Sequence, residues 1–456
     1  MPAAVNNPAK FRVAIIGAGL GGLAFALLMQ KHAHDTVEVD IYESAHELTE
    51  VGAGVAMWPR IWEIVRYLGL EDELLEISGA GRVGALPTVF TKSDEPTAVD
   101  VTTLPPGLYP FHRADLQKLL ARHLRAYDRI QYAKRLASYT EPASARDPVV
   151  LKFQDGTQAT CDVLVGCDGV HSAVRRTMYA DLANEAEARG DHEEAARLKA
   201  LNDPVWSGTV AYRGLVPVSE LAEDVLQVAR IPHIVLGKHK NVMFYPISGG
   251  EIINVVAFVN TPGAKGTRMR GWQSIAKPTL WAIHTVGHLP TYVKGRAILL
   301  GDAAHAMTPH QGSGAGQAIE VSYSTIFLFS HCFPGELRQL NLHFMWEQDG
   351  LVLSSLLAHD SVTLETLPQA LKIYDAIRLP FSQDVQRGSD EAGSIYHLHK
   401  FGWDKVSVEQ SAAGSYSQDM IDALGKGIKE KLDWVMKRDF MEMRMKALGI
   451  LEGASA

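Results

Sequence analysis

Arg12-Val-Ala-Ile-Ile-Gly-Ala-Gly-Leu-Gly-Gly22 is the stretch that decides the fold. The apolar, partly β-branched residues before its first glycine are typical of a strand buried in a parallel sheet. Gly17, Gly19 and Gly22 follow with G-x-G-x-x-G spacing, and the apolar run after them predicts a helix. In this arrangement the first glycine permits a tight turn, the second lets the backbone approach a pyrophosphate, and the third lets helix and strand pack closely.

A second strand-like run ends on an acidic residue at the spacing that a ribose-binding group requires. Residues 37–42 are typical of a strand, and Glu43 follows them, about 20 positions after the glycines. The four glycines within residues 17–22 count against two alternatives for residues 13–29, a signal-peptide core and a membrane span. Because strand, glycine turn, helix and acidic residue occur together, the pattern predicts an adenine-dinucleotide site with FAD as its occupant.

The composition is that of an ordinary globular protein with an acidic balance. The chain has 456 residues and a net charge of −8, without a dense block of Lys and Arg. We therefore expect neither nucleic acid nor a membrane as principal partner. The three cysteines are an odd number without metal-ligand spacing, which predicts no metal site and is typical of reduced thiols in a cytoplasmic protein.

The pattern along the chain predicts an α/β fold in which a Rossmann-like FAD-binding domain is interleaved with a β-sheet substrate domain. The FAD-binding domain is expected to be discontinuous and to consist of residues 11–80, 111–180 and 290–375. Short β-like runs assign residues 81–110 and 204–289 to the substrate-binding sheet. Residues 376–456 are expected to form a C-terminal helical region.

Two further segments pair a strand with a sharp turn. Residues 162–175 form the first, with Asp168 at the turn, and the apolar residues 297–300 lead to Asp302 in the second. A carboxylate at the end of a buried strand can accept hydrogen bonds from a ribityl chain. The backbone N–H groups of the glycine-rich loop around Gly314 can face the anionic edge of a flavin, because they open a helix.

These three motifs, in this order and spacing, resemble the FAD-dependent aromatic hydroxylases, the group A flavoprotein monooxygenases with the para-hydroxybenzoate hydroxylase fold. Within that family the chain is most similar to the salicylate hydroxylase-like branch, over residues 12–439. The resemblance implies FAD contacts along most of the predicted cofactor domain. These contacts are Gly17, Gly19, Gly22, Glu43, Gly54, Ala56, Arg113, Asp168, Asp302, Gly314 and Ala315.

The resemblance also implies a reaction. NAD(P)H would reduce FAD as a transient co-substrate, O2 would form a flavin hydroperoxide, and one oxygen atom would pass to the ring of a small phenolic acid. Carbon dioxide would leave if the attacked carbon bears a carboxylate. The resemblance places Arg213 and Tyr245 at the substrate, and His310, beside Pro309 at the expected flavin face, is a third candidate. Arg213 could pair with a carboxylate or phenolate, and His310 could relay a proton.

Alternatives stay open at this point. Arg213 could brace the sheet, Tyr245 could be a core residue and His310 could cap a turn, while Trp58 and His233 are expected to be structural. Alternative functions are an FAD-dependent monooxygenase or epoxidase of a larger secondary-metabolite substrate and a non-catalytic flavin-binding regulator. The sequence leaves open the substrate, the choice of NADH or NADPH, and whether the protein is a monomer or a homodimer.

Overall fold

The computed structural model describes most of the chain in ten segments. These are residues 9–33, 36–48, 54–78, 85–125, 130–144, 146–261, 263–266, 279–312, 349–436 and 442–455. Gly314 and Ala315, which the sequence places at the flavin, lie outside the described residues.

The first sheet has six strands in the order β16-β17-β10-β1-β2-β6. Its centre is β1 (Arg12–Ile16), which is parallel to β10 (Val163–Gly166) and to β2 (Glu38–Tyr42). The outer strands are β17 (Ala297–Leu299), β6 (Ile130–Gln131) and the antiparallel β16 (Val293–Lys294). Because β1, β10 and β17 are parallel, the segments that follow them meet at one edge of the sheet.

Helices bury this parallel sheet. The predicted helix after the glycine turn is α1 (Leu20–His32), which is buried from Leu23 to Met29 and packs against α10 (Asp349–Ala358) and α4 (Arg113–Arg122). A helix that is apolar all round is stable only when it is covered on all sides. The long α11 (Leu367–Tyr396) and α14 (Glu442–Ser455) pack on α10 and complete this layer.

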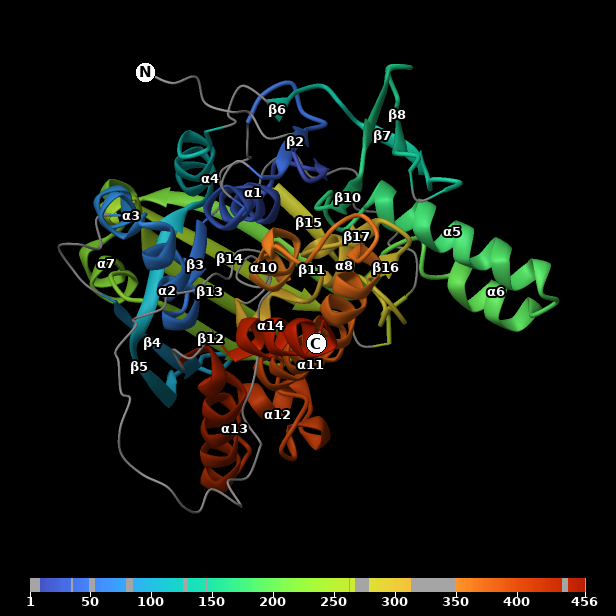
Figure 1. Ribbon diagram of the computed structural model, residues 1–456. Coiled ribbons are helices and arrows are strands. Elements are labelled where there is room, and N and C mark those ends of the chain that lie inside the picture. Colours follow the sequence, from blue (N-terminus) through green and yellow to red (C-terminus); the bar gives the residue numbers. More distant parts are fainter. Residues whose placement is uncertain are drawn as a thin grey trace, which may run out of the picture.

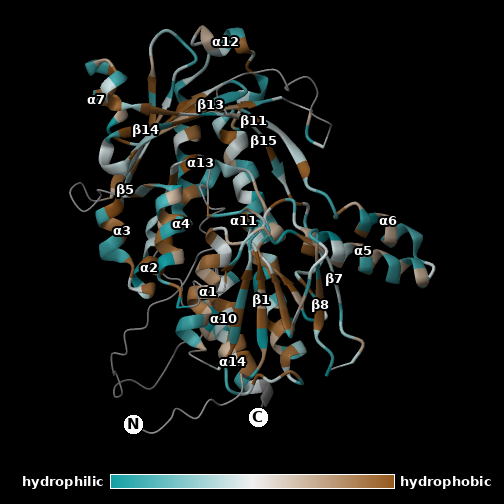
Figure 2. Ribbon diagram, turned by 90° about the horizontal axis from the view of Figure 1, so that it is seen from above, coloured by the Kyte–Doolittle hydropathy of each residue, from teal (hydrophilic) through white to brown (hydrophobic). Residues whose placement is uncertain are grey.

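The second sheet has eight strands in the order β15-β11-β14-β13-β12-β4-β5-β3. Figure 2 shows β11, β13, β14 and β15 at the opposite end of the molecule from β1, α10 and α14. Its strands are β3 (Gly54–Met57), β4 (Leu86–Lys92), β5 (Val99–His112), β11 (Val205–Pro217), β12 (His233–Gly237), β13 (Lys240–Ile247), β14 (Ile252–Asn260) and β15 (Thr279–Thr285). The strands from β11 to β14 are antiparallel, and their register pairs Arg213 with Val256 and Tyr245 with Asn254.

The remaining elements lie outside these two sheets. Figure 1 shows α5 and α6 projecting from one side of the molecule, next to the small sheet that contains β7 and β8. The three strands of that sheet are β7 (Leu136–Thr140), β8 (Val149–Phe153) and β9 (Gln158–Cys161). The other helices are α2 (Pro59–Leu68), α3 (Glu71–Ser78), α5 (Ala173–Ala188), α6 (His192–Lys199), α7 (Glu223–Ala229), α8 (Asp302–His305), α12 (Val408–Ala412) and α13 (Gln418–Met436).

This arrangement confirms the predicted mixed α/β fold. Along the chain, strands of the mostly parallel sheet come before, between and after the strands of the second sheet. The division of the chain into domains at the boundaries given above stays a prediction. None of the helices in the described part of the chain combines the length and the apolarity that a membrane span requires.

Candidate active site

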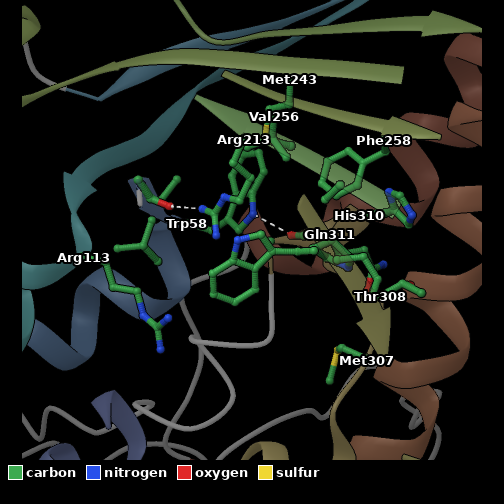
Figure 3. Close-up of a pocket in the computed structure, with 18 of the residues that line it drawn as sticks. Trp58, Arg113, Arg213, Met243, Val256, Phe258, Met307, Thr308, His310 and Gln311 are labelled. Carbon is green, nitrogen blue, oxygen red and sulfur yellow. Dashed lines mark hydrogen bonds between the residues drawn. The ribbon is translucent and has the colours of Figure 1, made fainter. Parts of the chain in front are cut away.

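A cavity of about 430 Å³ lies where the segments after β1, β10 and β17 meet the inner face of the eight-stranded sheet. Gly19, Gly169 and Asp302 line it from the parallel sheet, and Arg213 and Tyr245 line it from the other sheet. In open parallel sheets, ligands bind beyond the carboxyl ends of the strands, so this is the position expected of a cofactor site. Figure 3 shows part of the cavity lining, with Met243, Val256 and Phe258 on strands of the eight-stranded sheet.

The three glycines of the first motif have three different surroundings. Gly17 has φ +102°, and a Cβ atom there would lie 2.5 Å from the carbonyl oxygen of Cys167. A Cβ atom at Gly22 would lie 2.0 Å from the carbonyl oxygen of Gly17. At Gly19, by contrast, a Cβ atom would meet nothing within 4 Å. The first and third glycines are therefore required by the turn, whereas the second leaves open space at the N-terminus of α1. A contact of the FAD pyrophosphate with Gly19 stays a prediction.

Glu43 joins the end of β2 to this glycine turn. One of its carboxylate oxygens accepts a hydrogen bond from the Ala18 N–H at 2.7 Å, and the other accepts one from the Ala45 N–H at 2.7 Å. The carboxylate therefore lies against the glycine turn. A direct contact between Glu43 and the ribose stays a prediction.

The two aspartates of the later motifs differ in orientation. Asp168 accepts hydrogen bonds from Ser172 Oγ and from the N–H of Ala173 at 2.7 Å, so its carboxylate faces the N-terminus of α5, and burial raises its pKa. Its neighbours Cys167 and Gly169 line the cavity in its place. Asp302 is exposed, lines the cavity and has no hydrogen bond to the residues that the structure describes. Asp302 is therefore available to a ligand, whereas a direct contact of Asp168 with FAD stays a prediction.

The edge strand β3 brings further residues that the sequence assigned to FAD. Gly54 and Ala56 line the cavity, as does Arg113 at the start of α4. The Gly54 N–H donates to Asn254 Oδ1 at 3.0 Å, and a Cβ atom at Gly54 would lie 2.9 Å from Tyr245 Cε2. Sequence reasoning missed Asn254, although a buried amide within the otherwise apolar run of β14 is a signal that could have found it.

Arg213 and Tyr245 both reach the cavity from the eight-stranded sheet. The Arg213 guanidinium donates to the Gly54 carbonyl at 3.3 Å and lies 5.8 Å from the centre of the Trp281 ring. Burial raises the pKa of Tyr245 to about 12, although Arg213 opposes that shift. Tyr245 therefore stays a phenol at neutral pH, and Arg213 supplies a fixed positive charge in the same cavity.

His310 lies at the opposite side of the cavity, in the short turn η5 (Pro309–Gln311). It is only 4% exposed, and burial lowers its pKa to about 4, with Asp390 opposing the shift. Its ring lies edge-on to Phe258, with ring centres 5.3 Å apart. A neutral imidazole carries one donor and one acceptor nitrogen, so His310 can both take and give a proton.

Trp58 and His233, which the sequence offered only as weaker candidates expected to be structural, also line the cavity. Trp58 Nε1 donates to the Gln311 carbonyl at 2.9 Å and so ties α2 to the turn that carries His310 (Figure 3). His233 is stacked on Phe244 with ring centres 5.1 Å apart. Much of the remaining lining is apolar and includes Leu108, Ala211, Ile234, Met243, Val256 and Phe258.

A buried ionic network supports the turn that carries Asp302. The carboxylate of Asp349 accepts hydrogen bonds from the Gly301 N–H at 3.2 Å, from His305 Nε2 at 2.5 Å and from Arg378 Nε at 2.7 Å. Burial alone would raise the pKa of Asp349, but His305 and Arg378 outweigh burial and hold that pKa below its usual range. The network fixes the backbone of Gly301 from the core side.

Comparison with known proteins agrees with this geometry. A family model described as an FAD binding domain matches residues 10–206. A salicylate hydroxylase of Pseudomonas putida is 32% identical over 422 residues, which cover 85% of this chain and 86% of the relative. A 6-methylsalicylate 1-monooxygenase of Aspergillus terreus is 30% identical over 412 residues, which cover 81% of this chain and 83% of that relative. A solved structure of a salicylate hydroxylase substrate complex matches with a TM-score of 0.69 and 27% identity, over 96% of this chain and 98% of that one.

The fold and the site define an FAD-binding oxidoreductase. The chain belongs to the FAD-dependent aromatic monooxygenases, in their salicylate hydroxylase-like branch, which confirms the family predicted from its motifs.

Proposed function

We propose that this monooxygenase uses NAD(P)H and O2 to hydroxylate a small phenolic acid, and that it releases carbon dioxide when the attacked carbon bears the carboxylate. One observation carries the proposal: Arg213, Tyr245 and His310 converge on the same cavity that Gly19 and Asp302 line. The residues that we assign to the substrate and those that we assign to FAD therefore line the same cavity, as transfer of an oxygen atom between FAD and an aromatic ring requires.

The residues at the parallel sheet suit FAD. The open space at Gly19 would accept the pyrophosphate, Glu43 beside the glycine turn would bind the ribose, and Asp302 would bind the ribityl chain. Gly54 and Arg113 would border the flavin from the other side of the cavity. Bound FAD would carry electrons from NAD(P)H to O2 and so make one oxygen atom available to the ring.

The residues at the eight-stranded sheet suit an anionic phenol. Arg213 would pair with the phenolate or carboxylate of the substrate, because its guanidinium presents parallel N–H donors to two oxygens. Tyr245 would hydrogen-bond the same group from its neutral hydroxyl, and His310 would take the phenolic proton. A phenolate is more electron-rich than a phenol at the ring carbons that accept oxygen, so these contacts favour the reaction, while the apolar lining excludes water.

The relatives support this substrate class. The names of the two curated relatives place salicylate and 6-methylsalicylate among their substrates, and the second name assigns the oxygen to carbon 1. Carbon 1 of a salicylate bears the carboxylate, so oxygen transfer to it expels carbon dioxide. A cavity of about 430 Å³ that also admits the flavin ring leaves room for a single-ring acid.

The experiment is a turnover assay with the FAD-loaded protein. NADH and NADPH oxidation would be measured with salicylate, 6-methylsalicylate, 4-hydroxybenzoate and larger polyphenols, and hydroxylated product, carbon dioxide and peroxide would be quantified. We expect one single-ring phenolic acid to stimulate oxidation and to give product in a ratio near one to the NAD(P)H consumed. Product from the larger phenols alone would favour the alternative monooxygenase or epoxidase, and a protein that binds FAD but oxidises no NAD(P)H would contradict the proposal.

A further inference from the structure

One large aromatic side chain of the cavity lies at its rim. Trp281 is on β15, the edge strand of the eight-stranded sheet, and it lines the cavity. It is nevertheless 42% exposed to solvent. Because the stabilisation from burial scales with the apolar area removed from water, core packing alone does not explain an indole at this position.

The indole N–H of Trp281 does not help to hold the fold together. The indole N–H groups of four other tryptophans donate hydrogen bonds to a backbone carbonyl or a carboxylate, and these tryptophans are Trp58, Trp62, Trp206 and Trp403. For Trp281, the described part of the chain provides no such acceptor. The polar contact that its ring does make is with the guanidinium of Arg213.

The register of the sheet brings Trp281 and Arg213 onto one face. Strands β11 and β15 are antiparallel, and their register pairs Arg213 with Thr279 and Ala211 with Trp281. Residues on adjacent strands that are offset by two positions share a face and lie within reach of an aromatic and a long side chain. Ala211, opposite the indole, is small and so leaves room for the ring beside Arg213.

The guanidinium of Arg213 is held from two sides. It donates to the Gly54 carbonyl at 3.3 Å, and its central carbon lies over the Trp281 ring, 5.8 Å from the ring centre. That separation is within the range of a cation–π contact. The ring attracts the positive charge as a whole, whereas a carboxylate binds the N–H donors at the edge of the guanidinium, so the two contacts are compatible.

We propose that Trp281 is a positioning residue, which holds the Arg213 guanidinium where that group receives the carboxylate of the substrate. Trp281 thereby selects phenols that bear a carboxylate over neutral phenols. This inference rests on the proposed function, because it needs a phenolic acid bound next to Arg213. It adds to that function the side chain that orients the charge and the substrate group that the charge recognises.

The residues around Arg213 favour the carboxylate as its partner. A guanidinium presents two parallel N–H donors, which match the two oxygens of a carboxylate better than the single oxygen of a phenolate. The phenol has other partners in the cavity, because Tyr245 and His310 are neutral groups that can donate or accept a hydrogen bond. Arg213 is thus the group that distinguishes an acid from a neutral ring.

Trp281 also covers this ion pair. The indole lines the cavity and is exposed to solvent at the same time, so it lies between Arg213 and the open edge of the sheet. An ion pair is stronger where water is excluded, because the effective dielectric constant is lower there. Loss of the indole would therefore weaken acid binding in two ways, through the cation–π contact and through entry of water.

The test compares acids with the corresponding amides. The FAD-loaded protein would be titrated with salicylate and salicylamide, and with 4-hydroxybenzoate and 4-hydroxybenzamide, while the flavin spectrum reports binding. The members of each pair share the ring and the hydroxyl group, and only the acid carries a charge. In Trp281→Leu, the Kd for the preferred acid should rise about tenfold and that for its amide by less than about twofold, which is a size of effect that a partly desolvated cation–π contact can have.

Two variants control for the loss of side-chain volume. Trp281→Phe keeps an aromatic face, so the Kd for the acid should rise by only about threefold or less. Val259→Ala removes apolar atoms from a side chain of similar exposure, 41%, that is on β14 and does not line the cavity. This variant should bind acid and amide as the wild type does, and the Kd for FAD should stay unchanged in all variants.

A double-mutant cycle shows whether Trp281 acts through Arg213. In the Arg213→Gln background the guanidinium is absent, so Trp281→Leu should raise the Kd for the acid by no more than about twofold. An equal rise in both backgrounds, or an equal loss of acid and amide binding, would overturn the inference, while hydroxylated product from the wild type would leave the proposed function intact. A wild-type protein that binds FAD but neither acid would contradict the proposed function and this inference together.

Discussion

The imidazole ring of His310 rests directly on the backbone of Gly393. A Cβ atom at Gly393 would lie 2.3 Å from His310 Cδ2 and 2.8 Å from His310 Nε2. Gly393→Ala should therefore push the ring out of position in the cavity. We expect kcat to fall by about 10²-fold, as displacements of about 1 Å at a reacting centre can cause, while the Kd for FAD changes little because the cofactor glycines are on other elements.

The matched control is Gly449→Ala, since Gly449 is also inside a helix but a Cβ atom there would meet nothing within 4 Å. This variant should keep full activity and gain roughly 0.5–1 kcal/mol in the free energy of unfolding, because alanine favours the helix over glycine. Equal losses of kcat in both variants would show that the His310 contact has no special role.

Gly19 and Gly22 should respond to alanine in opposite ways. Gly19→Ala should leave the stability of the FAD-free protein near that of the wild type and weaken FAD binding, because its Cβ atom enters only the open space at α1. Gly22→Ala should lower the free energy of unfolding by about 3 kcal/mol or more, because its Cβ atom overlaps the Gly17 carbonyl oxygen. Denaturant unfolding of the FAD-free proteins and FAD titration by flavin fluorescence measure both effects.

The sequence was sufficient for the parts of the site that a local pattern encodes. The glycine turn, Glu43 and the strand that leads to Asp302 are short-range patterns whose geometry follows from spacing. The structure places Gly19 and Asp302 in the lining of one cavity and Glu43 against the glycine turn. Asp168 shows the limit of such patterns, because its carboxylate also suits the N-terminus of the helix that follows it, and there it accepts its hydrogen bonds.

The remaining contacts depend on which distant elements pack together. Gly393 meets His310 across more than eighty positions of sequence, and Asn254 supports Gly54 across two hundred. His397 lies behind His310 only because the end of α11 packs against the turn between β12 and β13. No periodicity or spacing encodes such a pairing, so a single sequence cannot supply it.

Arg213→Lys should separate substrate binding from FAD binding. The variant keeps the positive charge but loses the paired N–H donors that suit a carboxylate or phenolate. We expect KM for the phenolic acid to rise about tenfold, or 1.4 kcal/mol, with a nearly unchanged Kd for FAD. Steady-state kinetics and an FAD titration would measure this, and an unchanged KM would argue that Arg213 only braces Gly54.

The buried His397 should make the protein sensitive to mild acid. The folded-state pKa of His397 is about 2, below its ordinary value of 6.5, so the unfolded chain binds a proton that the folded chain refuses. This stability is fully present above pH 6.5 and is lost as the pH falls below it. Between pH 6.5 and 4, the free energy of unfolding should decrease more steeply in the wild type than in His397→Gln, by up to about 1.4 kcal/mol per pH unit. Parallel pH profiles would contradict the buried neutral state of His397.

Asp349 should be essential to the turn that carries Asp302. Asp349→Asn removes the negative charge between His305 and Arg378 and leaves a buried guanidinium without its counter-ion. We expect the free energy of unfolding to fall by about 3–5 kcal/mol. Urea unfolding measures it, and a loss below about 1 kcal/mol would mean that packing alone holds the turn.

The central claim is that one cavity holds FAD against the parallel sheet and a phenolic acid against the eight-stranded sheet. A crystal structure of the FAD-loaded protein with salicylate tests it most directly. We expect a pyrophosphate at Gly19, a ribityl chain at Asp302 and the phenol within hydrogen-bond distance of Arg213 and of Tyr245 or His310. A phenolic acid bound outside this cavity, or FAD bound away from Gly19 and Asp302, would contradict this claim.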